Sequence, residues 1–224
     1  MSTVSRPRPP GCRHRQYAMK QETRTRHNDP EGLRKGVLDT AAALFQARGY
    51  HATGIREILK ETRLSSGAFH HHFPTKDALA LAVITDRVAP TVRETWIDPI
   101  REARSLNAAI QTVFAAIIRG IERRGAVYGC PLNNLAMELS FSNPEFRDAL
   151  RAIFVEWQAA LAQRIAHTRG GGRLDKQDHA AAAAFIVATY SGAMNLAKAT
   201  QSAAPLRAAA QTLSAWMKDR GFVD

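Results

Sequence analysis

Apolar residues recur at helical spacing along most of the chain. The first clear example follows i, i+4, i+5, i+8, i+11 and i+12 and ends near Gly49; its members are Leu33, Val37, Leu38, Ala41, Leu44 and Phe45. Sustained alternation of apolar and polar residues, the pattern of a strand, is nearly absent. The sequence therefore predicts an all-α protein.

Short helical units follow this first helix, each preceded by a residue that can cap a helix. Thr53 can cap one unit, Ser65 the next and Thr75 a third. The unit after Ser65 carries Phe69 and Phe73 on one face and stops at a proline. Three helices in so short a stretch, the last two joined by a tight turn, have the proportions of a helix-turn-helix unit.

Longer amphipathic helices are expected over the rest of the chain, with breaks near Pro90 and near Asp98-Pro99. The expected ranges are 76–88, 90–104, 107–124, 131–141, 144–168, 175–200 and 205–220. Residues 180–197 are uncharged and just long enough to cross a bilayer, but their alanine content and polar interruptions favour a buried helix over a membrane span. A small-residue face here, followed by Leu206, Leu213, Trp216 and Met217, suits a four-helix bundle between two subunits, so we expect a homodimer.

Charge divides the chain unevenly. Residues 1–28 hold seven Lys and Arg against one acid, Glu22, so they contribute +6 of the net charge of +11. We expect a basic flexible arm over 1–28, a DNA-binding domain over 29–76 and a larger domain over 77–224. Nucleic acid is the partner that this distribution favours. The two cysteines, Cys12 and Cys130, cannot build a disulfide framework, which favours a reducing cytoplasm.

The helix after Ser65 would be the one that reads DNA. At 100° per residue, Ser66, Gly67, His70 and His71 fall on one side, while Phe69 and Phe73 fall on the adjacent side. A small, polar face beside a buried aromatic face suits a helix in the major groove.

Two segments, TGIREI at 53–58 and LSSGAFHHHFPTKDAL at 64–79, resemble the DNA-binding signature of TetR-family repressors. The resemblance implies an all-helical homodimer whose larger domain binds a small effector. It also implies that Thr53 and Lys76 bind phosphate, that Ser66 and Gly67 approach base edges, and that His70 replaces a usual tyrosine. Arg63 stands where the family usually has glycine, so a left-handed residue or an altered turn is expected there. The full set of implied DNA contacts is Thr53, Ser66, Gly67, Ala68, His70, His71 and Lys76.

The segment 128–139 resembles the Gly-Cys-x-x-x-Asn-x-x-x-Glu pattern of one TetR branch, with Asn133 where many members have glycine. The resemblance places Cys130, Asn134, Met137 and Glu138 near an effector pocket. Four aromatic residues could form its walls, although residues at such spacing often only pack in a core: Trp96, Phe114, Trp157 and Tyr190. Cys130 precedes a helix, so it is either a sensor thiol activated by the helix dipole or an inert buried thiol.

Enzymatic function is not indicated, because the chain lacks a nucleophile elbow, a His-x-x-x-His pair and a dinucleotide fingerprint. The three consecutive residues His70 to His72 diverge around a helix and cannot converge on one metal ion, so neither a metal nor a cofactor is expected. The favoured interpretation is a cytoplasmic, ligand-responsive repressor that binds a palindromic operator as a homodimer and is released by a small, fairly apolar effector. The alternative is an architectural DNA-binding protein that needs no effector.

Overall fold

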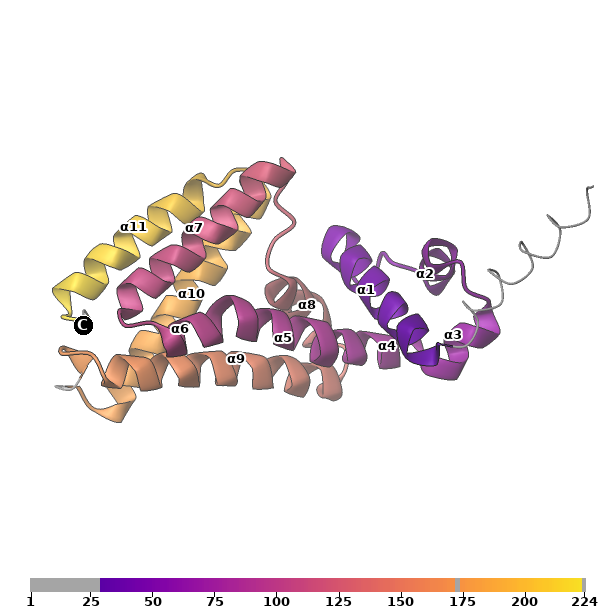
Figure 1. The fold of residues 1–224 in the computed structure, drawn as a ribbon, viewed down its shortest axis with the longest axis horizontal. Coiled ribbons are helices and arrows are strands. Elements are labelled where there is room, and N and C mark those ends of the chain that lie inside the picture. The colour runs from indigo at the N-terminus through magenta and orange to yellow at the C-terminus, as the bar shows by residue number, and fades with distance from the viewer. Residues whose placement is uncertain (1–28, 172–173, 223–224) are drawn as a thin grey trace, which may run out of the picture. The chain divides into compact units, whose positions relative to one another are not determined.

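A computed structural model describes residues 29–171 and 174–222, and within these ranges it contains helices and turns but no strand. The prediction of an all-α protein is confirmed (Figure 1). The expected basic arm, residues 1–28, lies outside the described residues. Contacts divide the chain into two units, Met1–Gly36 and Val37–Asp224, and every site discussed below belongs to the second.

The helix-turn-helix is formed by α1 (Pro30–Arg48), α2 (Ile55–Thr62) and α3 (Ser66–His72). Its core is a set of side chains that are at most 2% exposed and come from all three helices: Val37, Leu38, Ala41, Phe45, Ile58 and Phe69. α3 has only seven residues, far fewer than a helix needs to persist alone in water. The buried contacts must therefore hold α3 in place.

A long helical segment follows, and the breaks expected near Pro90 and Asp98-Pro99 do not occur. α4 (Lys76–Val83), α5 (Ala89–Val92) and α6 (Asp98–Glu102) are joined by π-helical turns at Ile84–Val88 and Arg93–Ile97. The expectation was wrong because each π turn lies just before a proline and shifts the hydrogen-bond register to i→i−5.

The first π turn shows how this works. A proline lacks the N–H that would bond to the carbonyl four residues earlier, which for Pro90 is Asp86 O. The Asp86 carbonyl instead accepts a hydrogen bond from Arg87 Nη1 at 2.8 Å. Ala89 N–H bonds to Ile84 O, so the chain passes the proline without leaving the helix.

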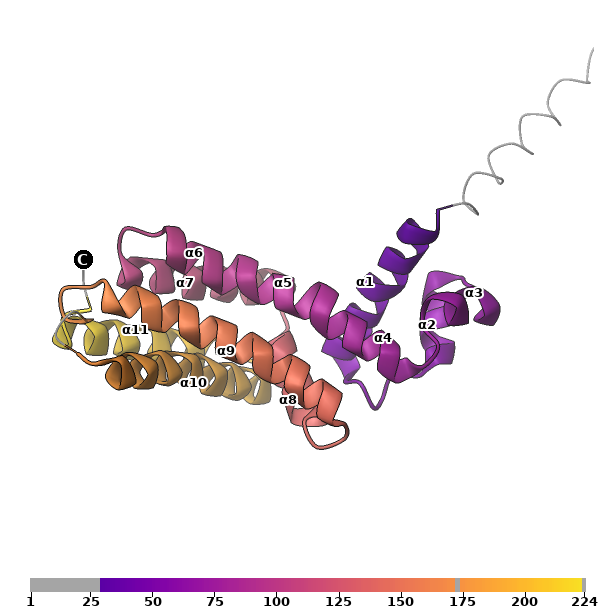
Figure 2. The ribbon, with the colours of Figure 1, turned by 90° about the horizontal axis from the view of Figure 1, so that it is seen from below.

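The remaining helices are α7 (Leu106–Arg124), α8 (Pro131–Leu139), α9 (Pro144–Ala166), α10 (Lys176–Thr200) and α11 (Ala204–Asp219). Their bounds lie within about two residues of the expected ones. α10 packs against both α9 and α11, and α11 also packs against α7. Figures 1 and 2 both show α9 running alongside the α5–α6 segment, which it also contacts.

α10 is, within the described residues, the one helix long and apolar enough to cross a membrane, and 44% of its apolar window is buried inside the protein. Its inner face packs in the helical core, as the sequence predicted. Its other face is exposed yet consists largely of small or apolar side chains at helical spacing: Ala181, Phe185, Ala188, Gly192 and Leu196.

Candidate nucleic-acid interface and effector site

The turn before α3 has the conformation that the sequence left open. Arg63 ends α2 with φ 56° and ψ 33°, the left-handed region in which glycine is usual. Its backbone N–H donates to Lys60 O at 3.3 Å, and Leu64 N–H donates to Leu59 O at 3.2 Å. A left-handed non-glycine residue costs about 1 kcal/mol. Arg63 adopts this conformation despite the cost, and the turn between α2 and α3 is therefore tight.

α3 is capped at its first turn as predicted. Ser65 is the N-cap, and its hydroxyl accepts a hydrogen bond from Ala68 N–H at 3.3 Å. Thr75 does the same for α4, accepting from Ala78 N–H at 3.0 Å. These caps fix where the short helix starts and where the long helical segment begins.

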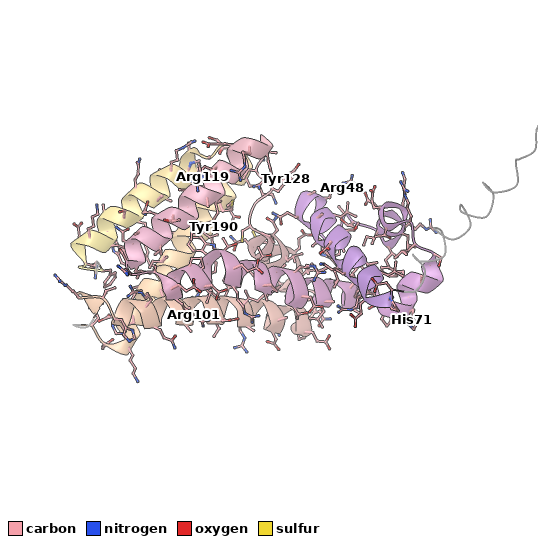
Figure 3. The ribbon with its side chains drawn as sticks, in the orientation of Figure 1. Arg48, His71, Arg101, Arg119, Tyr128 and Tyr190 are labelled. Atoms are coloured by element: carbon pink, nitrogen blue, oxygen red, sulfur yellow. The ribbon has the colours of Figure 1, made fainter. Side chains whose placement is uncertain are left out.

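The two sides of α3 have the predicted character, although Phe73 lies just past the helix, as its C-cap with φ −135° and ψ 97°. Phe69 is fully buried and Phe73 is 2% exposed, with their ring centroids 5.9 Å apart. The opposite face is exposed and carries Ser66, Gly67, His70 and His71, the last labelled in Figure 3, while Ala68 is half-buried. No atom of the described residues lies within 4 Å of a Cβ built on Gly67, so this face is open to a partner.

The His70 ring has one nitrogen already engaged. Nδ1 lies 3.2 Å from Pro74 O, and because a carbonyl can only accept, Nδ1 must carry the hydrogen. In the neutral ring Nε2 is then an acceptor. It can donate to a phosphate only when the ring is protonated.

Thr53 lies differently from the expectation that it caps α2. The N-cap is Gly54, which makes no side-chain cap bond, and the Thr53 hydroxyl donates instead to Gly49 O at 2.8 Å. Thr53 is fully buried. It satisfies a carbonyl at the end of α1, so a contact between its hydroxyl and a DNA phosphate would require this bond to break.

Lys76 is half-buried against Tyr50. Its Nζ donates to Tyr50 O at 2.7 Å and lies 4.0 Å from the centroid of the Tyr50 ring. Burial lowers the pKa of Lys76, although Asp77 and Glu138 oppose this shift. An ammonium group has three donors, so a phosphate contact remains possible for those not used by Tyr50.

Five of the eight residues predicted near the effector pocket come together in the larger domain. The ring centroids of Trp96 lie 4.6 Å from those of Tyr190, 4.9 Å from Trp157 and 5.7 Å from Phe114. Tyr190, labelled in Figure 3, shares a hydrogen bond with Cys130. Burial raises the pKa of the Cys130 thiol, which disfavours a thiolate at this helix start. We call these five residues the aromatic cluster.

Two buried N–H groups beside the aromatic cluster have no hydrogen-bond partner among the described residues. These are Trp157 Nε1 and Asn133 Nδ2. Asn133 is 5% exposed, and its Oδ1 accepts a bond from Ser191 Oγ at 3.3 Å. A buried donor without an acceptor costs about 1–3 kcal/mol, so both groups would gain from an acceptor brought by a ligand.

Asn134, Met137 and Glu138 do not join the aromatic cluster; the Glu138 carboxylate accepts a hydrogen bond from His51 N–H. Met137 is 75% exposed, whereas Asn134 bonds to Tyr128 O at 2.8 Å and to side chains of α1 and α10. The inward positions of α8 are instead Leu132, Asn133, Leu135 and Leu139. The Gly-Cys-x-x-x-Asn motif thus contributes Cys130 to the aromatic cluster, whereas its asparagine, Asn134, lies outside the cluster.

A separate crevice of about 70 Å³ lies between α1, the α4–α5 segment and α8, and sequence reasoning missed it. Such a volume is well below the roughly 300–1,000 Å³ of pockets for drug-sized ligands. Its lining includes Ala42, Gln46, Val83, Thr91 and Leu135. These residues show no shared pattern in the sequence, because they come from three separate helices.

A seven-residue helix with an exposed polar face, held by aromatic anchors after a left-handed turn, defines a helix-turn-helix DNA-binding protein. Residues 37–83 match the family described as bacterial regulatory proteins, tetR family. Residues 107–212 match the C-terminal domain of LmrA/YxaF-like transcriptional regulators. The chain belongs to the TetR family of transcriptional regulators, which are not enzymes.

Individual relatives agree. An uncharacterised HTH-type transcriptional regulator from Lactococcus lactis subsp. lactis is 31% identical over 165 residues, which is 74% of this chain and 83% of the relative. The HTH-type regulator YxaF of Bacillus subtilis (strain 168) is 29% identical over 59% of this chain and 69% of its own. A TetR transcriptional regulator from Chloroflexus aurantiacus J-10-FL has a TM-score of 0.73 and 31% identity, covering 84% of this chain and 96% of that one.

Proposed function

We propose that the chain is a cytoplasmic, ligand-responsive repressor that binds a palindromic operator as a homodimer. The observation that carries this proposal is α3, whose polar face is exposed while Phe69 and Phe73 anchor its other side. Residues 29–76 would form the reading head and 77–224 the effector-binding and dimerisation domain. Ser66, Gly67, Ala68, His70 and His71 would face base edges and backbone in the major groove, with Lys76 and, after rearrangement, Thr53 at phosphates.

Dimerisation would use α10 and α11. The exposed face of α10 is small and apolar. On α11 the residues expected at the interface are not available, because Leu206, Leu213 and Met217 are buried within the subunit and Trp216 is half-buried; its exposed residues include alanines at positions 204, 208 and 215. Small residues let helices of two subunits approach closely, and a two-fold arrangement closes the interface. A dimer would present two copies of α3 to half-sites about 34–36 Å apart.

The effector would bind at the aromatic cluster. The rings offer apolar contact, and Trp157 Nε1 and Asn133 Nδ2 lack acceptors, so a fairly apolar molecule with a hydrogen-bond acceptor fits best. Binding there must separate rings that now touch. The effector would release the operator by favouring a dimer whose two α3 helices no longer match successive major grooves.

Selection of binding sequences from a random DNA duplex library tests the proposal. The wild-type chain should enrich one palindrome, and the variant Ser66→Ala/His70→Ala should lose affinity for it by at least about tenfold. Lys176→Met, an exposed change at the start of α10 and off the face proposed for the dimer, is the matched control and should bind normally. Failure to enrich any sequence, with a steep salt dependence only, would favour an architectural DNA-binding protein.

A further inference from the structure

The C-terminal end of α1 is fastened to α8 and to the loop before it. Gln46 Nε2 donates to Gly129 O at 2.6 Å, and Asn134 Nδ2 donates to Gln46 Oε1 at 3.3 Å. Both polar ends of the Gln46 amide are thereby used. These bonds join positions 83 and 88 residues apart in sequence.

A second attachment lies one helical turn further along α8. His51 N–H donates to Glu138 Oε2 at 3.1 Å. Asn134 and Glu138 are four residues apart, so they share one face of the helix. Gly49 has φ +90°, and a Cβ there would lie 2.7 Å from Glu138 Oε1. The positive φ favours glycine at this position, and the missing Cβ leaves room for the Glu138 carboxylate.

The same asparagine reaches α10. Lys198 Nζ donates to Asn134 Oδ1 at 3.0 Å, and Asn134 Nδ2 also donates to Tyr128 O. A directional series of hydrogen bonds thus runs from the Lys198 ammonium through the Asn134 and Gln46 amides to the Gly129 carbonyl. Each bond in such a series polarises the next and strengthens it.

We propose that Asn134 is a positioning residue that ties the reading head to α10. The latch, defined as Gln46, His51, Asn134 and Glu138, holds the end of α1 against α8. Buried side chains of α2 and α3 share one hydrophobic cluster with those of α1, so the latch also fixes the position of α2 and α3 relative to α8. Lys198 adds the link to the helix proposed to carry the dimer interface. The first part of this proposal, the mechanical part, is that the latch holds α1 against α8, and it is independent of DNA. The second part, that the latch affects operator binding, rests on the proposed function.

Hydrogen exchange of the full-length protein without DNA tests the mechanical part. Asn134→Ala should speed exchange in the segment 46–53 about fivefold, the factor that corresponds to one typical net hydrogen bond. Lys198→Met should speed it about twofold, since the ammonium is exposed and its bond is weakened by solvent. Lys176→Met makes the same chemical change on the same helix, outside the latch and off the proposed dimer face, and should leave this segment unchanged.

A double variant distinguishes a connected series from separate local effects. Lys198→Met should add nothing in the Asn134→Ala background, because its path to α1 runs through that amide. Glu138→Gln keeps an oxygen for His51 N–H and should exchange as the wild type does. Equal effects of Lys198→Met in both backgrounds, or no effect of Asn134→Ala on 46–53, would overturn the proposal.

Operator binding by the same variants separates this proposal from the repressor function. If the wild type selects an operator, Asn134→Ala should weaken binding several-fold while the melting temperature hardly changes. If the wild type binds no specific DNA but exchange follows the pattern above, the latch stands and the repressor function fails. If the operator is bound and the exchange pattern is absent, the latch fails and the repressor function stands.

Discussion

Truncation of Phe69 should release α3 from the rest of the helix-turn-helix. The side chain is fully buried, packs against Phe73 and holds a helix of seven residues that cannot persist alone. Phe→Ala changes in a core typically cost about 3–5 kcal/mol. At about 1.4 kcal/mol per factor of ten, Phe69→Ala should increase hydrogen exchange across residues 55–73 by a factor of about 100 to 4,000.

The matched control is His71→Ala, two residues away on the exposed face of α3. Surface changes of this kind stay within about 0.5 kcal/mol, so exchange should change by about twofold at most. Hydrogen exchange with mass spectrometry can follow both variants peptide by peptide. Less than a tenfold change in Phe69→Ala, or a similar change in His71→Ala, would refute the view that a buried aromatic anchor positions α3.

Four further outcomes are expected. Because Nδ1 of His70 is held by Pro74 O, Nε2 is the ring nitrogen left to contact DNA, so His70→Phe should bind the operator less tightly than the wild type, and equal affinities would exclude this contact. Burial raises the pKa of the Cys130 thiol above its usual value of 9.0, so at alkaline pH the folded state keeps the thiol proton while the unfolded state loses it. The free energy of unfolding should therefore be constant below about pH 9 and fall above it, and it should fall less in Cys130→Ser. Urea titrations of both proteins on either side of pH 9 would measure this. In a Cys12→Ser background, a thiol reagent should modify Cys130 only after unfolding; rapid labelling of the folded protein would restore the sensor hypothesis. No described atom lies within 4 Å of a Cβ on Gly192, so Gly192→Arg should keep the fold but convert a dimer to monomers by light scattering, and an unchanged dimer would place the interface elsewhere.

Local signals predicted the reading head well. The caps at Ser65 and Thr75 and the two faces of α3 depend on residues close in sequence, so helical spacing was sufficient to place them. The helix breaks expected at the prolines of the α4–α6 segment do not occur, because a π turn before each proline lets the helix continue. The sequence has no pattern that distinguishes a π turn from an ordinary helical turn. Thr53 was misplaced as a cap because the carbonyl it satisfies, Gly49 O, belongs to the preceding helix end.

The effector site was predicted only in part. Large aromatic residues gathered as expected, since each needs a buried environment. Asn134 and Met137 failed to join them because the motif fixes their spacing along α8 but not the helix's rotation relative to its neighbours. Asn133, the residue that departs from the family's usual glycine, is the inward one. The asparagine in place of glycine was the one sign in the sequence that a polar side chain would be buried at this position.

The most direct measurement of whether α3 reads DNA is a footprint of the dimer on its selected duplex with a reagent for guanine N7, which lies in the major groove. The wild type should protect two major-groove patches about one helical turn apart, and Gly67→Glu, which adds a charge to the open face of α3, should abolish both while the protein stays folded. A selected duplex that is bound without any protection of guanine N7, or two patches that persist unchanged in Gly67→Glu, would contradict the assignment of α3 as the reading helix.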